Sequence, residues 1–163
     1  MTRRITPFLW FDTEAEEAAR FYVSIFPNSR IAAVTRYDEE GAKAAGRPKG
    51  SVMTVQLELD GQELVALNGG PIFKLTEAIS FVVNCETQAE VDHFWNGLSA
   101  GGQDVQCGWL KDRFGLSWQV VPTILPRMLQ DADPDRARRV MAAMLQMKKI
   151  DIEGLRSAYE APR

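Results

Sequence analysis

The residues of this chain best suited to bind or transform a small molecule gather in one stretch, 107–122, with the sequence CGWLKDRFGLSWQVVP. Its pattern predicts a β-hairpin, because a charged turn at 111–113 and Gly115 separate an approach strand from an apolar exit strand at 116–121. The hairpin carries two tryptophans and a glutamine, with three charges at its turn. Indole rings stack on planar or apolar molecules, so we interpret the hairpin as one wall of a small-molecule cavity.

Further candidate contacts to a ligand lie on strands predicted elsewhere in the chain. The tryptophans would stack on the ligand, the amide side chains would fix its polar groups, and the lysine and arginine of the turn could receive an anion. In the alternative interpretation, the tryptophans fill the core and the charged turn is an ordinary solvated one. The predicted cavity residues are Trp10, Gln56, Glu58, Asn68, Trp109, Lys111, Arg113, Trp118 and Gln119.

An enzyme is the second hypothesis, and its candidate acid–base groups are Glu58, Asp112 and Cys107. A carboxylate on a strand that faces an apolar cavity would have a raised pKa, which suits general acid–base work. The chain has one histidine, His93, which falls on a predicted helix and is interpreted as a surface residue. A catalytic Cys–His pair is therefore not predicted, and Cys85 and Cys107 are interpreted as buried structural residues.

The bulk composition argues against several classes of protein. The chain of 163 residues can bury a stable core without disulfides, and its two cysteines suit a reducing compartment. Its net charge of -3 argues against a nucleic-acid-binding groove, which normally has a basic surface. No apolar run approaches the ~20 residues of a membrane span, and no signal peptide is recognised, so we expect a cytoplasmic protein.

The first half of the chain reads as a strand, a helix and three further strands. Apolar and polar residues alternate at 51–59, and the Asp-Gly dipeptide at 60–61 is a strong hairpin signal. Thr13 followed by Glu16 predicts a capping box at the start of the helix, and the polar segment 38–50 is predicted to be a long loop. The predicted elements are strand 5–11, a helix between Thr13 and Pro27, and strands 29–37, 51–59 and 62–67.

The second half follows the same order. A strand is predicted at 79–85, and Thr87 with Glu90 predicts a capping box at the head of the next helix. The segment 104–110 is predicted to be one strand or, if Gly108 divides it, two short strands. A second βαβββ unit results only if Gly108 makes that division.

Local matches indicate that the two halves are copies of one unit. Residues 11–16, FDTEAE, match residues 85–90, CETQAE, as strand, cap and helix. Gly61 and Gly115 each precede the last strand of their half. Two such copies would pair to form one curved sheet. We predict an α+β fold with a domain at 1–122, made of paired βαβββ modules at about 1–70 and 77–122, and a C-terminal helical extension at 123–163.

After Pro122 the pattern becomes helical. A short helix is predicted at 124–129, and Asp133-Pro134 opens the next helix because Asp caps helices and Pro suits their first turn. The methionines of 140–148 predict an amphipathic helix, which either packs on its own domain or forms a groove for a partner. Asp151 opens a last helix.

Four stretches of the chain resemble a known family. They are PFLWF with EAARFY and IFPNS, ALNGGPIF with AISFVVNC, EVDHFWNGL with CGWLKDRFGLSWQVVP, and RVMAAMLQMKKIDIEGLRSA. Together they resemble the PhnB-like branch of the vicinal oxygen chelate superfamily, which is often labelled a demethylubiquinone methyltransferase domain. The superfamily also holds glyoxalase I, bleomycin-resistance proteins and extradiol dioxygenases. The resemblance covers nearly the whole chain and implies paired βαβββ modules and a homodimer.

The resemblance also implies where a metal would bind. In the metal-using relatives, His, Glu or Gln ligands come from the first and last strands of each module, whereas this chain offers neither imidazole nor carboxylate there. Gln119 alone stands where a Glu ligand would, and a catalytic divalent ion needs about three protein ligands. We therefore predict no metal and no cofactor. The residues offered by these strands are Thr6, Phe8, Trp10, Ala66, Asn68, Ala78, Ser80, Trp118 and Gln119.

The methyltransferase label has no matching nucleotide motif. The Gly-rich segment 68–71 follows a predicted strand but runs into Pro71 rather than into a helix, so it is interpreted as a turn. We expect a metal-free small-molecule-binding protein that forms a homodimer and contacts neither nucleic acid nor membrane. The alternatives are an enzyme that acts on a small aromatic or quinone-like substrate, a methyltransferase by label only, and a subunit that only associates with a partner.

Overall fold

The structure is a computed structural model that describes residues 4–162 of the chain. The chain divides into two units, residues 1–75 and 76–163, and each is described by itself. Each unit holds a four-stranded mixed sheet with a helix packed against it, which confirms the predicted α+β fold of βαβββ modules. None of the helices in the described part of the chain is long and apolar enough to cross a bilayer.

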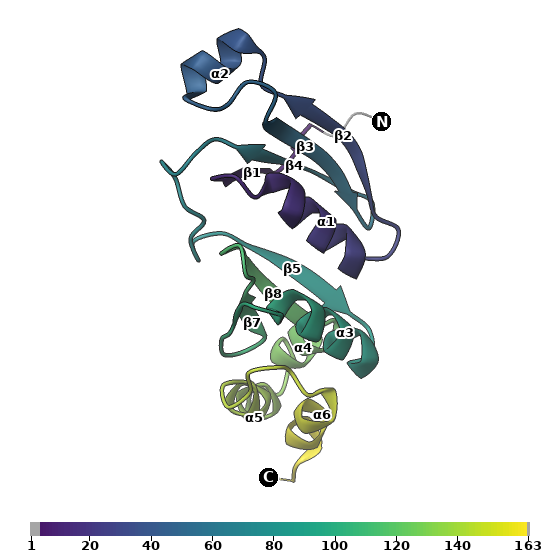
Figure 1. Cartoon of the computed structure of the whole chain (residues 1–163). Helices are drawn as coiled ribbons and strands as arrows, with labels where there is room; N and C mark the ends of the chain where they lie inside the picture. The colour runs from purple at the N-terminus through teal and green to yellow at the C-terminus, as the bar shows by residue number, and fades with distance from the viewer. Residues whose placement is uncertain (1–3, 163) are drawn as a thin grey trace. The chain divides into compact units, whose positions relative to one another are not determined.

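The first unit is a mixed sheet crossed by one helix (Figure 1). Its elements are β1 (Phe8–Phe11), α1 (Ala15–Ile25), β2 (Arg30–Arg36), α2 (Glu39–Ala45), β3 (Val52–Leu59) and β4 (Gln62–Asn68). The strand order is β1-β4-β3-β2, in which β1 runs parallel to β4 and the other neighbours are antiparallel. The helix α1 contacts β3 and β4 and so covers one face of the sheet.

The core of the first unit lies between this sheet and α1. On β3, Val55 and Leu57 are buried whereas Gln56 between them is exposed, as expected for a strand with one covered face. On α1, Ala18 and Tyr22 lie one turn apart and are buried against the sheet. The apolar residues of β3, which alternate along the strand, and those of α1, which recur with helical spacing, therefore face the same interface between sheet and helix.

The segment predicted as a long polar loop contains the short helix α2. The side chain of Asp38 caps this helix by accepting the N–H of Gly41 at 2.7 Å. Gly46 ends the helix in the left-handed region, with φ of 64°. The loop prediction was wrong because Ala, Glu and Lys, which make the segment polar overall, are also strong helix formers once a cap is present.

The predicted capping box at Thr13 and Glu16 is also wrong. The cap position of α1 is Glu14, whose side chain makes no capping hydrogen bond. The N–H of Ala15 donates instead to Oδ1 of Asn68 at the end of β4, at 2.8 Å. The cap comes from a residue 53 positions further along the chain, so a local sequence pattern could not identify it.

The second unit repeats the module and adds three helices (Figure 1). Its elements are β5 (Ser80–Cys85), α3 (Gln88–Ser99), β6 (Gln103–Asp104), β7 (Trp109–Lys111), β8 (Ser117–Pro122), α4 (Ile124–Leu129), α5 (Pro134–Met144) and α6 (Ile152–Glu160). The strand order is β5-β8-β7-β6, with β5 parallel to β8, as in the first unit. Of the two alternatives for 104–110, the structure shows two short strands, with positive φ values at Cys107 and Gly108 between β6 and β7. The capping box of Thr87 and Glu90 is confirmed on α3.

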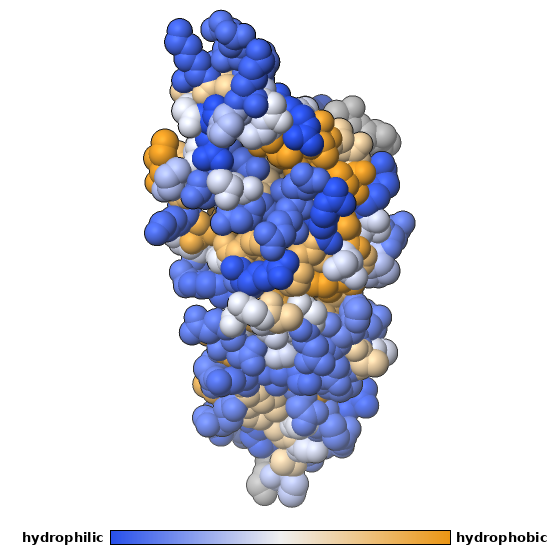
Figure 2. Space-filling model, viewed as in Figure 1, coloured by the Kyte–Doolittle hydropathy of each residue, from blue (hydrophilic) through white to orange (hydrophobic). Residues whose placement is uncertain are grey.

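The three C-terminal helices share a core of their own. The predicted Met-rich helix is shorter than 140–148, because α5 ends at Met144. Met144 and Met147 pack against the core, whereas Met141 and Leu145 are exposed. The side shown in Figure 2 is mainly hydrophilic over these helices, and hydrophobic surface gathers over the first unit. The buried members of the C-terminal core are Leu125, Met128, Val140, Ile150 and Leu155.

Backbone hydrogen bonds hold the loop between α5 and α6 against the sheet of the second unit. The N–H of Cys107 donates to the carbonyl of Met147 at 2.8 Å, and that of Gly108 to the carbonyl of Lys148 at 2.7 Å. A Cβ on Gly108 would lie 2.8 Å from the carbonyl oxygen of Val120 and 3.1 Å from Cγ1 of Ile150. Glycine at this position therefore allows the helical extension to approach the sheet.

Candidate functional site

Each sheet has one face that its own unit does not cover with a module helix. We call the face opposite α1 the first open face and the face opposite α3 the second open face. Strand register assigns side chains to these faces, because directly paired residues share a face. The first open face carries Phe8, Trp10, Thr54, Gln56, Glu58, Val65 and Leu67. The second carries Ser80, Val82, Asn84, Trp109, Lys111 and Gln119.

Trp10 on the first open face is held at the ends of two strands. Its indole N–H donates to the carbonyl of Gly70 at 2.9 Å. A Cβ on Gly69 would lie 2.2 Å from Cζ2 of Trp10, so only glycine leaves room for the indole there. Phe73 meets the ring edge-on, with 4.9 Å between centroids, and is itself 62% exposed. The pair is an aromatic surface with one side available to a ligand.

Gln56 and Glu58 extend the first open face along β3. The side chain of Gln56 is exposed and has no hydrogen-bond partner among residues 4–162. Glu58 forms an ion pair with Arg30 across β2 and β3, with 2.9 Å between Oε2 and Nη2. Its carboxylate therefore has a cationic partner rather than the apolar surroundings that the acid–base hypothesis requires.

Asn68 lies on the opposite face of the sheet and is 5% exposed. Its Oδ1 accepts the N–H of Ala15, and its Nδ2 donates to the carbonyl of Val52 at 3.2 Å. Its own carbonyl accepts the hydroxyl of Tyr37 at 2.7 Å. The sequence-based role of Asn68 as a ligand contact does not match this placement, because the side chain joins α1, β3 and β4 instead.

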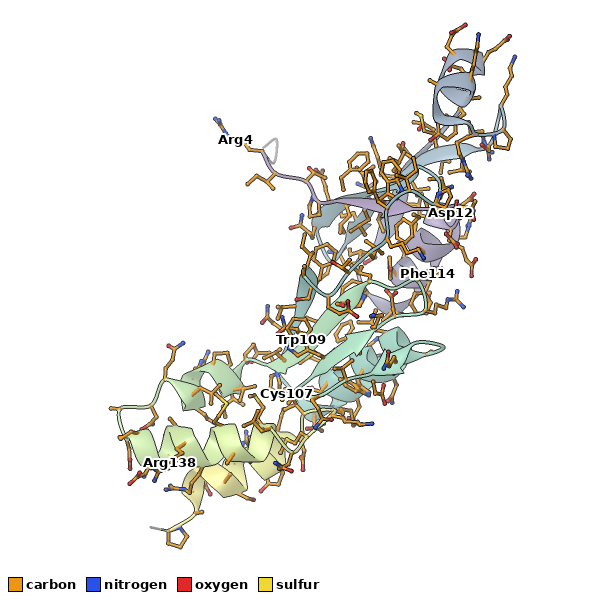
Figure 3. The ribbon with its side chains drawn as sticks, turned by 90° about the vertical axis from the view of Figure 1, so that its left-hand side faces the viewer. Arg4, Asp12, Cys107, Trp109, Phe114 and Arg138 are labelled. Atoms are coloured by element: carbon orange, nitrogen blue, oxygen red, sulfur yellow. The ribbon has the colours of Figure 1, made fainter. Side chains whose placement is uncertain are left out.

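Trp109 and Gln119 face each other across β7 and β8 on the second open face. Trp109 is partly buried, at the start of β7 (Figure 3), and its indole N–H has no partner among the described residues. The Nε2 of Gln119 donates to the hydroxyl of Ser80 on β5 at 2.9 Å, which leaves the amide oxygen available. A free donor, a free acceptor and an indole plane are thus brought together.

The two cations of the hairpin already have partners. Lys111 forms an ion pair with Glu77, and its hydrogen bond lowers the pKa of that carboxyl group. The guanidinium of Arg113 lies over the ring of Phe114, 4.9 Å from its centroid. An anion at this turn would have to displace Glu77 from Lys111.

Asp112 and Trp118 form a structural unit inside the hairpin. Trp118 is 3% exposed on the α3 side of the sheet, so it fills the core, as in the alternative interpretation. Its indole N–H donates to Oδ2 of Asp112 at 2.9 Å. The Oδ1 of Asp112 accepts the backbone N–H groups of Phe114 at 2.9 Å and Leu116 at 3.0 Å. The carboxylate therefore shapes the turn, and this use of Asp112 does not fit its predicted role as an acid–base group.

The remaining titratable candidates lie in different parts of the second unit. Cys85 is buried, and burial raises the pKa of its thiol to about 11, helped by the negative charge of Glu90. Cys107 is partly exposed beside β7 (Figure 3), and His93 is exposed on α3. Among residues 4–162, no three His, Cys, Asp or Glu side chains come together as a metal site would require.

Four residues near the open faces were missed by sequence reasoning. In the sequence analysis Ser80 appears only among the residues that do not bind a metal, although its hydroxyl orients Gln119. Glu77 and Phe73 lie in the connection between the modules, which carries no periodic pattern, and each is placed by a contact to a strand residue. Arg47 was hidden in the segment predicted to be a loop. Of these, only the Phe73 position had a signal, since it follows the Gly-rich turn after β4.

Comparisons with known proteins agree with this geometry. The sequence model of the 3-demethylubiquinone-9 3-methyltransferase family matches residues 3–121, so the C-terminal helices lie beyond the match. A search of curated proteins finds no match. A Bacillus cereus PhnB protein, provisionally named a 3-demethylubiquinone-9 3-methyltransferase, is 34% identical, with a TM-score of 0.66 over 74% of this chain and 100% of that one.

Two more distant solved structures share the fold. A Pseudomonas aeruginosa protein is 23% identical, with a TM-score of 0.61 over 74% of this chain and 98% of that one. The fosfomycin resistance protein FosX from Listeria monocytogenes, solved with Mn(II) and sulfate, is 14% identical, with a TM-score of 0.51 over 78% of this chain and 96% of that one. These likenesses concern the arrangement of the strands and helices alone.

Proposed function

Because the chain belongs to the 3-demethylubiquinone-9 3-methyltransferase family, within the vicinal oxygen chelate superfamily, we propose that it binds a small planar molecule on its open faces. The proposal includes a homodimer, as the family resemblance implies, and a binding mode without a metal ion, because this chain lacks the His and carboxylate ligands of the metal-using relatives. The observation that carries it is the pairing of Trp109 with Gln119. Trp109 offers a flat indole ring with an N–H donor, and the amide oxygen of Gln119 lies beside it as an acceptor.

This arrangement supports recognition of a molecule with an aromatic body and polar edges. Stacking on an indole contributes about 0.5–1.5 kcal/mol beyond burial, and each neutral hydrogen bond about 0.5–1.5 kcal/mol. The Ser80 hydroxyl holds the Gln119 amide in one orientation, so less conformational entropy is lost when a ligand binds. A quinone or a phenol offers the matching carbonyl or hydroxyl groups.

The side chains on the open faces support binding without a metal ion. Glu58 on the first open face and Glu77 beside the second each form an ion pair with a cation, and Glu63 lies opposite Glu58, but among residues 4–162 no third His, Cys, Asp or Glu joins them as a metal site would require. Gln119 alone is left at the position of a metal ligand in the relatives, and one neutral amide oxygen is a weak anchor for a divalent cation. Elemental analysis of the purified protein should find no stoichiometric zinc, nickel, manganese or iron; a stoichiometric metal would contradict this part of the proposal.

The enzyme hypothesis has no observation of its own beyond the family name. Asp112 is hydrogen-bonded within the turn, and Glu58 is paired with Arg30. A methyl transfer also needs a methyl donor, so titration calorimetry with S-adenosylmethionine separates the two functions. We expect no heat of binding; measurable binding would favour the methyltransferase.

The binding test uses duroquinone and 2-naphthol as planar probes, followed by tryptophan fluorescence and calorimetry. Gln119→Ala and Trp109→Leu should each weaken binding about 5- to 20-fold, because each removes one hydrogen bond or the stacking surface. Gln62→Ala is the matched control, since Gln62 lies in the other unit and its Nε2 donates to the carbonyl of the adjacent Glu63. The proposal fails if no planar probe binds, or if the Gln62 and Gln119 variants weaken binding equally.

A further inference from the structure

One arginine of the first unit is mostly buried and has little to balance its charge. The side chain of Arg47 is 16% exposed. Its Nε is buried and has no hydrogen-bond partner, and among residues 4–162 it is the one buried side-chain nitrogen or oxygen in that state. Its contact to Asp12 is long, with 3.5 Å between Nη1 and Oδ1, and Asp12 is itself 47% exposed. A guanidinium has five N–H donors, and here one of them has a marginal acceptor.

The backbone places Arg47 at this position. Gly46 turns the chain through the left-handed region at the end of α2. The N–H of Arg47 then donates to the carbonyl of Ala42 at 2.9 Å, which fixes the start of its side chain. The helix α2 is an insertion between β2 and β3 that has no counterpart between β6 and β7 of the second unit. The first unit therefore holds its buried cation by means of an added element.

The guanidinium lies at the carboxyl ends of the parallel strands β1 and β4. Asp12 follows β1 directly (Figure 3), and Gly70 follows β4. A Cβ on Gly70 would lie 3.8 Å from Nη1 of Arg47, and the carbonyl of Gly70 accepts the indole N–H of Trp10. Ligands commonly bind at the carboxyl ends of parallel strands, where neighbouring connections part. The guanidinium of Arg47 and the aromatic pair of Trp10 and Phe73 thus both lie next to Gly70.

A buried, poorly paired guanidinium is unfavourable in the free protein and favourable once an oxyanion takes two of its N–H groups. We propose that Arg47 binds the carboxylate or phosphate group of a small aromatic ligand, whose ring lies against Trp10 and Phe73. The inference rests on the proposed function, because it names the chemical class of ligand for the first open face. Asp12 leaves Arg47 when the ligand binds and turns to solvent, to which it is already half exposed.

The test compares 2-naphthoate with its neutral isostere 2-naphthamide by calorimetry on the full chain. We expect the anion to bind at least about 10-fold more tightly, because charge-assisted hydrogen bonds are the stronger ones. Arg47→Met should remove this preference. Asp12→Asn should tighten naphthoate binding, because it removes the competing carboxylate. Arg36→Gln is the matched control for loss of one positive charge, since Arg36 is exposed and bonds the carbonyl of Gly50.

The outcomes separate this inference from the proposed function. Equal affinity for the two probes in the unchanged protein overturns the role of Arg47 and leaves the proposed function standing. If neither naphthalene probe binds, titration with inorganic phosphate decides the matter for Arg47: binding that is lost in Arg47→Met supports an oxyanion site, and no binding overturns it. Should Arg47→Met fail to fold, Arg47→Lys replaces it, because lysine keeps the charge but loses the paired N–H donors; an undiminished preference for naphthoate would then contradict the inference.

Discussion

The two units end the same pair of parallel strands in opposite ways. In the first unit, Phe11 pairs with Asn68 at the ends of β1 and β4; in the second, Cys85 pairs with Pro122 at the ends of β5 and β8. Asn68 reaches to the start of α1 and caps it. Pro122 has no polar side chain, and α3 is capped by its own Thr87.

This difference shows what a duplicated module can change without changing its sheet. The first unit uses the end of β4 as a link to its helix, and the Gly69-Gly70 turn that follows leaves room for Trp10. The second unit caps its helix locally, so the end of β8 is free to continue into α4 and the C-terminal core. The same topological position thus serves a candidate site in one unit and an extension in the other.

The cores of the two units differ at an equivalent position as well. Counting back from the paired strand ends, Leu64 of β4 corresponds to Trp118 of β8, and both are buried. An indole brings an N–H donor into the core, and that donor needs an acceptor. Asp112 supplies it from the turn, whereas the corresponding turn of the first unit, at Asp60-Gly61, has no such task.

The largest effect is expected from removing this acceptor. Asp112→Ala leaves three N–H donors without their partner, two of the backbone and one of Trp118, and should lower the free energy of unfolding by about 3–5 kcal/mol. Urea denaturation followed by near-ultraviolet circular dichroism measures the loss and reports on the indole. Asp60→Ala is the control in the first unit, where the only cost is a left-handed residue, about 1–2 kcal/mol. Equal losses in the two variants would contradict the comparison.

The next effect tests the two capping arrangements. Asn68→Ala removes the acceptor for Ala15 N–H and the donor to the Val52 carbonyl in a buried place, and should cost about 2–3 kcal/mol. Thr87→Ala removes an exposed cap of α3 and should cost about 1 kcal/mol. Denaturant midpoints of the two variants give the order directly. A Thr87 variant as unstable as the Asn68 variant would show that capping, rather than the link between strands, sets the cost.

The sequence predicted what depends on local pattern. Alternation at 51–59, the capping box at Thr87 and the Asp cap before Pro134 each reflect residues within a few positions of one another, and each is confirmed. The predicted cap of α1 is wrong because the N–H donor belongs to Ala15 at the start of the helix and its acceptor to Asn68 at the end of β4. The helix α2 escapes prediction for another reason: its polar composition indicates a loop, whereas the helix propensity of its Ala, Glu and Lys residues and the cap at Asp38 favour a helix.

The candidate site was harder to predict than the fold, because a side chain's face depends on register. Trp109 and Trp118 are both tryptophans of one hairpin, yet one lies on the open face and the other in the core. The turn at 112–116 has an odd number of residues, so Trp109 pairs with Gln119 and Trp118 pairs with Leu110. Paired residues share a face and neighbours along a strand do not, so the two tryptophans lie on opposite faces. A turn one residue longer or shorter would place them on the same face. Arg47 could not be found at all from sequence, since its burial results from α2.

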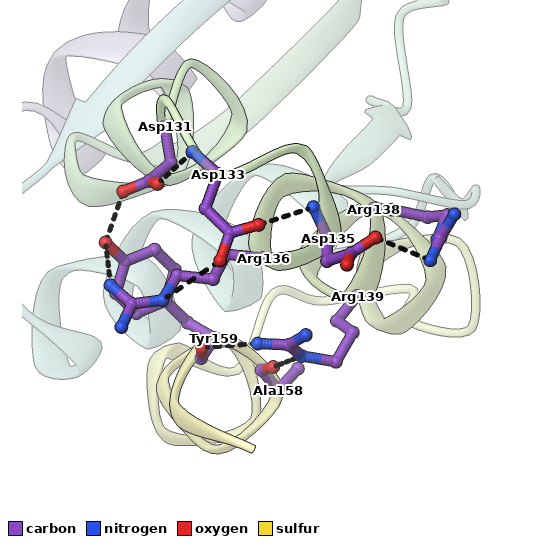
Figure 4. A network of polar contacts seen from close by, with 8 residues as sticks. All are labelled: Asp131, Asp133, Asp135, Arg136, Arg138, Arg139, Ala158 and Tyr159. Carbon is purple, nitrogen blue, oxygen red and sulfur yellow. Dashed lines mark hydrogen bonds and ion pairs between the residues drawn. The ribbon is translucent and has the colours of Figure 1, made fainter. Parts of the chain in front are cut away.

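The smallest expected effect compares a tyrosine hydroxyl in each unit. In the first, Tyr37 donates to the backbone carbonyl of Asn68, which carries no charge at any pH. In the second, Tyr159 of α6 donates to the carboxylate of Asp131 at 2.5 Å, within a network that includes Arg136 (Figure 4). Replacing either tyrosine by phenylalanine removes one hydrogen bond, but the two losses should depend differently on pH.

The hydrogen bond from Tyr159, with the backbone N–H of Asp133, lowers the pKa of the Asp131 carboxyl group. A carboxyl whose pKa is lower in the folded than in the unfolded chain stabilises the fold above its unfolded pKa, about 4, and loses that contribution as the pH falls through its folded pKa. The destabilisation caused by Tyr159→Phe should therefore be steady between about pH 5 and 8 and shrink below about pH 4. That of Tyr37→Phe should stay constant over the same range. Urea denaturation at fixed ionic strength measures both, and a parallel pH dependence of the two variants would show that Asp131 does not distinguish the units.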